Sequence, residues 1–491
     1  MPRFGVCLLV LVWSGPVGAQ TAAMARAASV AFHSQRDTLP LTSQQRREAD
    51  QLDQEAQHEM QAGQFGEALR RYAHATAILR DVAWTPTLEF AASLEGRIDH
   101  AMLDPGKPVT IALTALYPSN GKSAVSIDLV ATAKEGPAER ELASGAAVES
   151  TRLPFTTRLT IPEVIAGTYN LELRLASPDA PGPPALRDLY VKTFPVHIER
   201  LSEEARTLRE HLAKLQRRDS PALETAEYML QFYERTDRGE EGVRRFGHYP
   251  FHEQFIAANA ILDALDAGRD PFAGKHGDFR RAYRSPVDRT LQPYRIFVPD
   301  GYDSSQAVPL LIALHGAGGD ENDFFEDFPQ APLQPEVQRH GFILVCPKGR
   351  DPHSGYRGRA EQDVFDVLAE VQREYRIDAR RIYLMGHSMG AYATWRLAVE
   401  HPDLFAALGP IAGGGDPKDE VKLRHIPQFI VHGANDQTVP VAQSRAMAEA
   451  ARQAGAAVVY VEVPGAGHYD AAIGQFGPML DFFARQARRA P

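Results

Sequence analysis

The stretch Arg-Ile-Tyr-Leu-Met-Gly-His-Ser-Met-Gly, residues 381–390, decides the fold of the C-terminal part of this 491-residue chain. Its apolar start predicts a buried strand, and the G-x-S-x-G pattern that follows is typical of a sharp turn from a strand into a helix. Side chains at Gly386 and Gly390 would collide with neighbouring backbone, so the two glycines permit the tight turn. We therefore expect a strained Ser388 whose hydroxyl stands above the edge of a sheet.

Two further polar residues follow predicted strands later in the chain. Asp436 comes shortly after the apolar run 427–433, and His468 follows the run 458–463. The chain order Ser388, Asp436, His468 is that of α/β-hydrolases, in which the histidine is the general base and the aspartate holds its tautomer. Because open α/β sheets gather their sites at the carboxyl ends of strands, the three side chains are expected to meet.

A glycine-rich loop is predicted to supply the oxyanion hole of this site. The apolar run 309–314 predicts another buried strand, which leads directly into His-Gly-Ala-Gly-Gly at 315–319. Small residues let backbone N–H groups approach a substrate closely, as in the corresponding loop of esterases. We expect the N–H of Ala317, or that of Gly316, to act together with the N–H of Met389.

Other polar residues near this site have alternative interpretations. Asp416 follows the triple glycine 413–415 and is the rival carboxylate to Asp436. His315 and His387 are predicted to be structural hydrogen-bonding groups rather than proton carriers.

The loop 348–358 is the predicted wall of a substrate cleft. Tyr356, Arg357 and Glu361 are candidates for substrate contact, and a solvated loop is the alternative. The segment 248–253 holds two histidines, but Pro250 argues against a regular helical pair and no further ligand cluster is evident. We therefore predict no metal site.

These motifs carry a resemblance to a known family. The stretch from about Asp288 to Phe483 resembles secreted α/β-hydrolase esterases related to polyhydroxybutyrate depolymerases, feruloyl esterases and acetylxylan esterases. It departs from many relatives at Ala391, where they carry a second glycine. The matching pieces are His315-Gly316-x-Gly318-Gly319, Gly386-His387-Ser388-Met389-Gly390, His432-Gly433-x-x-Asp436 and Gly467-His468.

The resemblance implies a serine hydrolase that cleaves carboxylic esters through an acyl-enzyme, with no metal or organic cofactor. The substrate would be an ester of a small molecule or one linked to a polymer. The same groups also cleave amides, so an exported prolyl-oligopeptidase-like peptidase is the alternative, although no blade-like repeat of a β-propeller is found. A catalytically idle binding protein on the same scaffold is a third hypothesis.

Composition and the N-terminus bear on location and partners. The formal net charge of −10 gives no support for nucleic-acid binding. Residues 1–19 have the charged start, short apolar core and small-residue end of a signal peptide. We expect export to the periplasm or the outside, with no stable membrane insertion after cleavage; a retained signal anchor is the alternative. Cys346 would then be the sole cysteine, predicted as a buried, inert thiol.

The expected fold class is α/β: a doubly wound, mostly parallel α/β-hydrolase sheet, preceded by a helical hairpin and an all-β immunoglobulin-like sandwich. Residues 43–82 have helical periodicity broken near Gly63 and resemble a single tetratricopeptide-like unit. Residues 84–199 alternate in strand fashion and predict the sandwich. Residues 201–269 return to a helical pattern, and residues 280–491 form the catalytic domain. Whether the protein forms a homo-oligomer is left open.

Overall fold

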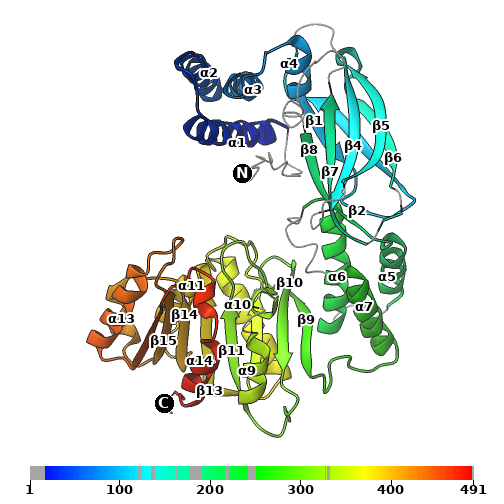
Figure 1. The fold of residues 1–491 in the computed structure, drawn as a ribbon. Coiled ribbons are helices and arrows are strands. Elements are labelled where there is room, and N and C mark those ends of the chain that lie inside the picture. The colour runs from blue at the N-terminus through cyan, green and yellow to red at the C-terminus, as the bar shows by residue number, and fades with distance from the viewer. Residues whose placement is uncertain are drawn as a thin grey trace. The chain divides into compact units, whose positions relative to one another are not determined.

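The structure is a computed structural model of the chain (Figure 1). It describes residues 17–119, 124–133, 139–161, 163–164, 166–176, 191–215, 220–240, 250–326, 328 and 332–488. The chain divides into two compact units. The first comprises Met1–Glu210 and Leu230–Ile256, and the second comprises His211–Met229 and Ala257–Pro491.

Three helices begin the first unit: α1 (Val17–Thr38), α2 (Ser43–Gln61) and α3 (Phe65–Leu79). A capping box formed by Thr42 and Gln45 starts α2, which satisfies backbone groups left free at the helix end. The sequence did not indicate α1 as a helix; it buries Phe32 against the other two helices. The last three residues of the predicted signal peptide begin α1, and residues 1–16 lie outside the described structure.

Two sheets that share one apolar core follow the short helix α4 (Pro86–Ser93). The first has the order β1-β3-β6, and the second has the order β2-β8-β7-β4-β5; all pairings are antiparallel except β2 with β8. The predicted turn at 120–121 and loop at 177–184 lie outside the described residues. The bounds are β1 Leu94–Ile98, β2 Met102–Leu103, β3 Pro108–Ala115, β4 Ala124–Ala133, β5 Glu139–Glu149, β6 Phe155–Thr160, β7 Gly167–Ala176 and β8 Val191–Ile198.

Helices α5 (Ser202–Lys214), α6 (Pro221–Asp237) and α7 (Phe251–Asp266) come next, and the boundaries between the two units fall inside them. His248, one of the two histidines in the segment 248–253, lies outside the described residues. Within the described ranges, no group of three or more His, Cys, Asp or Glu side chains could hold a metal ion. In the same ranges, no helix combines the length and the apolar character that a membrane crossing requires.

The second unit is built on an eight-stranded sheet with the order β16-β15-β14-β13-β11-β12-β10-β9 (Figure 1). The six strands β11 to β16 run parallel to one another. β10 pairs antiparallel with β12, and β9 pairs antiparallel with β10. The strand bounds are β9 Gly277–Arg284, β10 Leu291–Val298, β11 Val308–Leu314, β12 Ile343–Pro347, β13 Ile377–His387, β14 Ala407–Ile411, β15 Gln428–Gly433 and β16 Val458–Val463.

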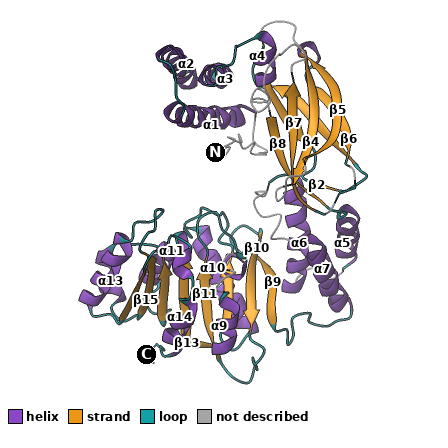
Figure 2. Ribbon diagram, viewed as in Figure 1, coloured by secondary structure: helices purple, strands orange, loops and turns teal. Residues whose placement is uncertain are grey.

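Helices lie on both faces of this sheet, as Figure 2 shows. The central strands are therefore buried from two sides, which explains why β11 and β12 are continuous apolar runs instead of alternating ones. Cys346 lies in β12 and is buried, as predicted, and burial raises the pKa of its thiol. The main helices are α9 Leu333–His340, α10 Arg359–Glu374, α11 Met389–Glu400, α13 Ala442–Ala454 and α14 Phe476–Ala484.

The strand order places the predicted site residues at the carboxyl ends of the strands. Chain progression reverses direction between β11 and β13, and such switch points open a crevice at the carboxyl ends of the strands. Ser388 follows β13, and the loop that begins at His315 follows β11. Asp436 and His468 follow β15 and β16, which pair in parallel, so both loops leave the sheet at the same end.

Candidate active site

Ser388 occupies the tip of a sharp turn between β13 and α11. Its φ of 52° and ψ of −116° are rarely adopted by residues with a side chain, and such strain persists only where the surroundings enforce it. A Cβ on Gly390 would lie 2.0 Å from the carbonyl oxygen of Leu314, and one on Gly386 would lie 2.3 Å from the oxygen of Gly390. The two glycines are therefore required sterically by the turn that presents Ser388.

Asp436 and His468 are joined by a short hydrogen bond. Nδ1 of His468 lies 2.7 Å from Oδ2 of Asp436, so this nitrogen carries the proton that the carboxylate accepts. The other carboxylate oxygen accepts the backbone N–H groups of Thr438, at 2.8 Å, and Val439, at 2.9 Å. Burial raises the pKa of Asp436, but these hydrogen bonds outweigh it and hold the pKa below its usual value. The aspartate stays ionised and fixed in orientation.

His432 is a further neighbour of Asp436 that the sequence reasoning assigned no role. Its Nε2 lies 3.2 Å from Oδ2 of Asp436 and 3.0 Å from the carbonyl oxygen of Val439. Its Nδ1 lies 2.7 Å from the hydroxyl of Ser444. The ring is fully buried, and burial lowers its pKa. A neutral His432 protonated at Nε2 therefore donates to the carbonyl oxygen of Val439 and lies beside the same Asp436 oxygen that His468 contacts. The spacing of four residues in His-Gly-Ala-Asn-Asp was the available signal.

His387 and His315 are held by structural hydrogen bonds. Nε2 of His387 lies 2.9 Å from the carbonyl oxygen of His468, and the two rings are 4.8 Å apart between centroids. Burial lowers the pKa of His387 to about 4, so it donates as a neutral ring at physiological pH. Nε2 of His315 lies 2.7 Å from the carbonyl oxygen of Lys348. His387 thus ties the backbone of His468 to the turn that carries Ser388.

The predicted oxyanion loop lies against the Ser388 turn. A Cβ built on Gly316 would lie 3.5 Å from Cβ of Ser388. In the described structure the N–H of Ala317 has no hydrogen-bond acceptor, whereas the N–H of Gly318 donates to Pro352. Met389 is the first residue of α11, and the first N–H groups of a helix have no intrahelical partner. In the described structure, Ala317 and Met389 therefore each offer a free backbone N–H.

The three residues predicted for substrate contact have different environments. Tyr356 is fully buried, and its hydroxyl accepts the N–H of His315 at 2.9 Å, so it holds the loop in place and offers no surface to a ligand. Glu361 lies 2.7 Å from Arg396 and neutralises it. Arg357 is exposed and lines a cavity together with Ser388. Of the three, Arg357 alone remains available for substrate contact.

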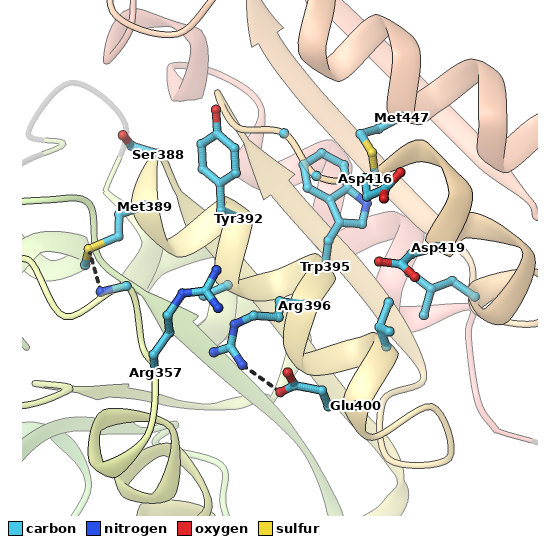
Figure 3. A pocket seen from close by; sticks show the side chains of 16 residues that line it. Arg357, Ser388, Met389, Tyr392, Trp395, Arg396, Glu400, Asp416, Asp419 and Met447 are labelled. Carbon is cyan, nitrogen blue, oxygen red and sulfur yellow. Dashed lines mark hydrogen bonds and ion pairs between the residues drawn. The ribbon is translucent and has the colours of Figure 1, made fainter.

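A cavity of about 610 Å³, here called the Ser388 cavity, extends from Ser388 along α11 (Figure 3). Its volume lies within the range of small-molecule sites. Trp395 forms part of its wall, and apolar side chains from α11, α12 (Glu420–Leu423) and α13 complete much of the lining. The lining residues are Gly355, Arg357, Ser388, Met389, Tyr392, Ala393, Trp395, Arg396, Val399, Glu400, Gly414, Gly415, Asp416, Asp419, Leu423 and Met447.

Asp416, the rival carboxylate, lines this cavity and does not contact His468. Its side chain accepts the backbone N–H of Lys418 at 3.0 Å and so caps a short 3₁₀ helix. The carboxylate beside His468 in the described structure is that of Asp436.

A buried carboxyl stands behind the wall of the Ser388 cavity. Trp395 Nε1 donates to Gln428 at 2.9 Å, and Gln428 donates to Oε2 of Glu420 at 2.6 Å. Glu420 is fully buried, and its Oε1 has no hydrogen-bond partner in the described structure. Burial raises the pKa of Glu420 to about 7.

We expect Glu420→Gln to stabilise the protein at pH 8, because the amide imitates the protonated acid. The folded pKa lies above the unfolded one, so the stability that this group contributes is complete below about pH 4.5 and is lost as the pH rises through about 7. A shift of this size corresponds to at most about 3 kcal/mol. Urea unfolding at pH 5 and pH 8 measures the effect, with Glu449→Gln on the exposed face of α13 as control. An equal gain at both pH values contradicts the buried-acid explanation.

Residues 311–421 match the model of the Alpha/beta hydrolase family. The bifunctional acetylxylan esterase/xylanase XynS20E of Neocallimastix patriciarum is 31% identical over 136 residues, which cover 27% of this chain and 20% of the relative. The probable feruloyl esterase C of Aspergillus terreus is 27% identical over 152 residues, which cover 30% of this chain and 56% of the relative.

A third relative is the poly(3-hydroxyalkanoate) depolymerase C of Paucimonas lemoignei. It is 30% identical over 132 residues, which cover 24% of this chain and 30% of the relative. The chain thus spans between 20% and 56% of the length of these curated relatives. The resemblance to feruloyl esterases, acetylxylan esterases and polyhydroxyalkanoate depolymerases that the motifs indicated is confirmed for the α/β-hydrolase region.

Proposed function

We propose that this chain is an exported serine hydrolase that cleaves carboxylic esters, with Ser388 as nucleophile, His468 as general base and Asp436 as the residue that orients His468. The observation that carries the proposal is the strained Ser388 at the end of β13, together with the 2.7 Å contact between Asp436, which follows β15, and His468, which follows β16. Homology to carboxylic ester hydrolases supports the choice of reaction.

In the first half of the reaction, the Ser388 oxygen attacks the ester carbonyl while Nε2 of His468 takes the hydroxyl proton. This nitrogen is free to accept because Nδ1 carries the hydrogen bonded to Asp436. No hydrogen bond joins Ser388 to His468 in the described structure, and such contacts commonly tighten only when the substrate binds. The protonated His468 returns the proton to the leaving alcohol, and an acyl-enzyme remains.

In the second half, a water molecule attacks the acyl carbonyl, His468 takes its proton, and Ser388 regains it as the acid leaves. The N–H groups of Ala317 or Gly316 and of Met389 stabilise the negative oxygen in both tetrahedral intermediates. Removal of one such donor typically costs about 10²–10³ in rate. No metal or organic cofactor takes part in these steps.

We also propose roles for the N-terminal parts of the chain and for Arg357. Residues 1–19 direct export, and the two-sheet part of the first unit is an accessory domain of immunoglobulin type, joined to the helical hairpin at 43–82. Of the predicted substrate contacts, Arg357 is retained because it is exposed beside Ser388 in the Ser388 cavity. The substrates would be esters of short acyl chains or of phenolic acids linked to polymers.

A panel of substrates tests the reaction class. We expect the purified mature protein to hydrolyse p-nitrophenyl acyl esters of increasing length and a feruloyl ester, and to leave a proline-containing peptide amide largely intact. Initial rates give kcat/KM for each compound, and the dependence on chain length reports the size of the acyl pocket. Rapid amide cleavage with slow ester cleavage would replace the esterase by an exported oligopeptidase.

A further inference from the structure

Two arginines line the Ser388 cavity, and in the described structure only one of them forms ion pairs with carboxylates. Arg396 lies 2.7 Å from Glu361 and 2.6 Å from Glu400, and it also donates to the carbonyl oxygen of Tyr356. Arg357 is exposed and, in the described part of the chain, has no ion pair or side-chain hydrogen bond. The cavity therefore contains one guanidinium that is paired with two carboxylates and one guanidinium that has no carboxylate partner among the described residues.

The acidic side chains of the cavity do not compensate Arg357. Glu400 is paired with Arg396, and Asp419 lies 2.8 Å from Lys422. Asp416 accepts a backbone N–H at the start of a short helix. In Figure 3, Asp416 and Asp419 lie beyond Trp395, and Arg357 is drawn on the side of Met389. The uncompensated positive charge thus belongs to the end of the cavity that holds the nucleophile.

The backbone that leads into Arg357 is anchored at the two residues before it, Gly355 and Tyr356. Tyr356 adopts a φ of 53°, which places its ring in the core, where its hydroxyl accepts the N–H of His315. The N–H of Gly355 points at the sulfur of Met389, at 3.3 Å. A bulky residue at a positive φ is uncommon and is maintained only by its surroundings. These contacts fix the backbone that presents Arg357 to the cavity that Ser388 also lines, so binding has to order the arginine side chain but not the loop.

We propose that Arg357 binds a carboxylate of the substrate, so that the preferred esters carry a negative charge close to the scissile bond. The inference rests on the proposed ester hydrolysis and specifies its substrate class. A guanidinium matches a carboxylate in shape and donates two parallel hydrogen bonds to it. The chain as a whole has a net charge of −10, so attraction of an anion to this cavity has to come from a local positive charge.

Matched pairs of esters test the proposal. In the first pair the acyl side differs: the mono-p-nitrophenyl ester of adipic acid is compared with that of adipamic acid, which has a neutral amide in place of the carboxylate. In the second pair the alcohol side differs: acetyl esters of 4-hydroxybenzoic acid and of 4-hydroxybenzamide are compared. The readout is the ratio of kcat/KM for the anionic over the neutral ester, after subtraction of spontaneous hydrolysis.

We expect a ratio of about ten in favour of the anionic ester in at least one pair, as for a charge-assisted, partly exposed contact. Arg357→Gln brings that ratio close to one, whereas Arg357→Lys retains part of it because the charge remains. Arg359→Gln is the matched control: Arg359 is exposed two residues away, contacts Asp288 at 3.3 Å and does not line the cavity, so its variant keeps the native ratio.

Two results overturn the inference while leaving ester hydrolysis intact. One is a native ratio at or below one in both pairs, and the other is a ratio that Arg357→Gln does not change. Failure of the proposed function gives a different result, since then none of the four esters is hydrolysed above the spontaneous rate.

Discussion

Replacement of Ser388 by alanine is expected to abolish ester turnover, with kcat reduced by about 10⁶-fold, as for nucleophiles of comparable serine hydrolases. The substitution removes the atom that would carry the acyl group, and no other hydroxyl follows β13 at the turn into α11. Because alanine and serine both carry a Cβ and tolerate a positive φ about equally, the substitution adds no backbone strain and the fold is expected to survive. Initial rates on p-nitrophenyl esters measure the loss, and circular dichroism with thermal melting monitors the fold.

Thr394→Val on α11 is a suitable control for Ser388→Ala. Thr394 is fully buried, and its hydroxyl donates to the carbonyl oxygen of Gly390 at 2.9 Å, so the variant also removes a hydroxyl near the turn. We expect it to retain turnover within about tenfold, with a stability cost of about 1 kcal/mol or more for the lost hydrogen bond. Retention of native rates by Ser388→Ala would show that the nucleophile has been misassigned.

Replacement of Asp436 by asparagine is expected to lower kcat by about 10⁴-fold with little change in KM. The amide can turn its nitrogen toward His468, which favours the tautomer with the proton on the wrong nitrogen. It also loses charge-assisted hydrogen bonds, since the carboxylate accepts the N–H groups of Thr438 and Val439 and faces Nε2 of His432. Steady-state kinetics over a range of substrate concentrations separate the two parameters.

The acid limb of the rate profile gives a second measurement on Asp436. The pKa of Asp436 is lowered in the folded protein, so its carboxylate stays ionised to a lower pH than a free aspartate does. The part of the rate that depends on this carboxylate is therefore lost only as the pH falls through the lowered pKa. Asp416→Asn is the matched control, because Asp416 lines the same cavity without contacting His468. A large loss in Asp416→Asn combined with a mild effect of Asp436→Asn would exchange the roles of the two carboxylates.

Strands buried on both faces were predictable from the sequence, and strands with charged or interrupted patterns were not. β11 and β15 are apolar runs buried along almost their whole length, and β13 is buried from Ile382 onward; β16 is an apolar run as well, but at the edge of the sheet its residues are partly exposed. β9 contains Arg281, which is almost fully buried, stacks over Phe272 and pairs with Glu374 at 2.6 Å. A buried arginine interrupts the alternation of apolar and polar residues that marks a strand. Because the partner of Arg281 is distant in the sequence, the local pattern gave no indication that β9 is buried.

Within the site, the sequence predicted which residues act but could not describe how their surroundings hold them. The order of Ser388, Asp436 and His468 follows from motif and strand positions alone. The burial of Tyr356 depends on its positive φ and on the N–H of His315 forty-one residues earlier, neither of which is encoded in a local pattern. The pairing of Arg396, which leaves Arg357 uncompensated, likewise depends on contacts between α10 and α11.

Covalent labelling tests the central claim most directly. Purified protein is treated with a fluorophosphonate, and the intact mass and the modified peptide are determined by mass spectrometry for the native chain and for Ser388→Ala. We predict a single adduct on Ser388 in the native protein, and none in the variant. An adduct on another residue, or an unmodified native protein that still hydrolyses esters, would contradict Ser388 as the nucleophile.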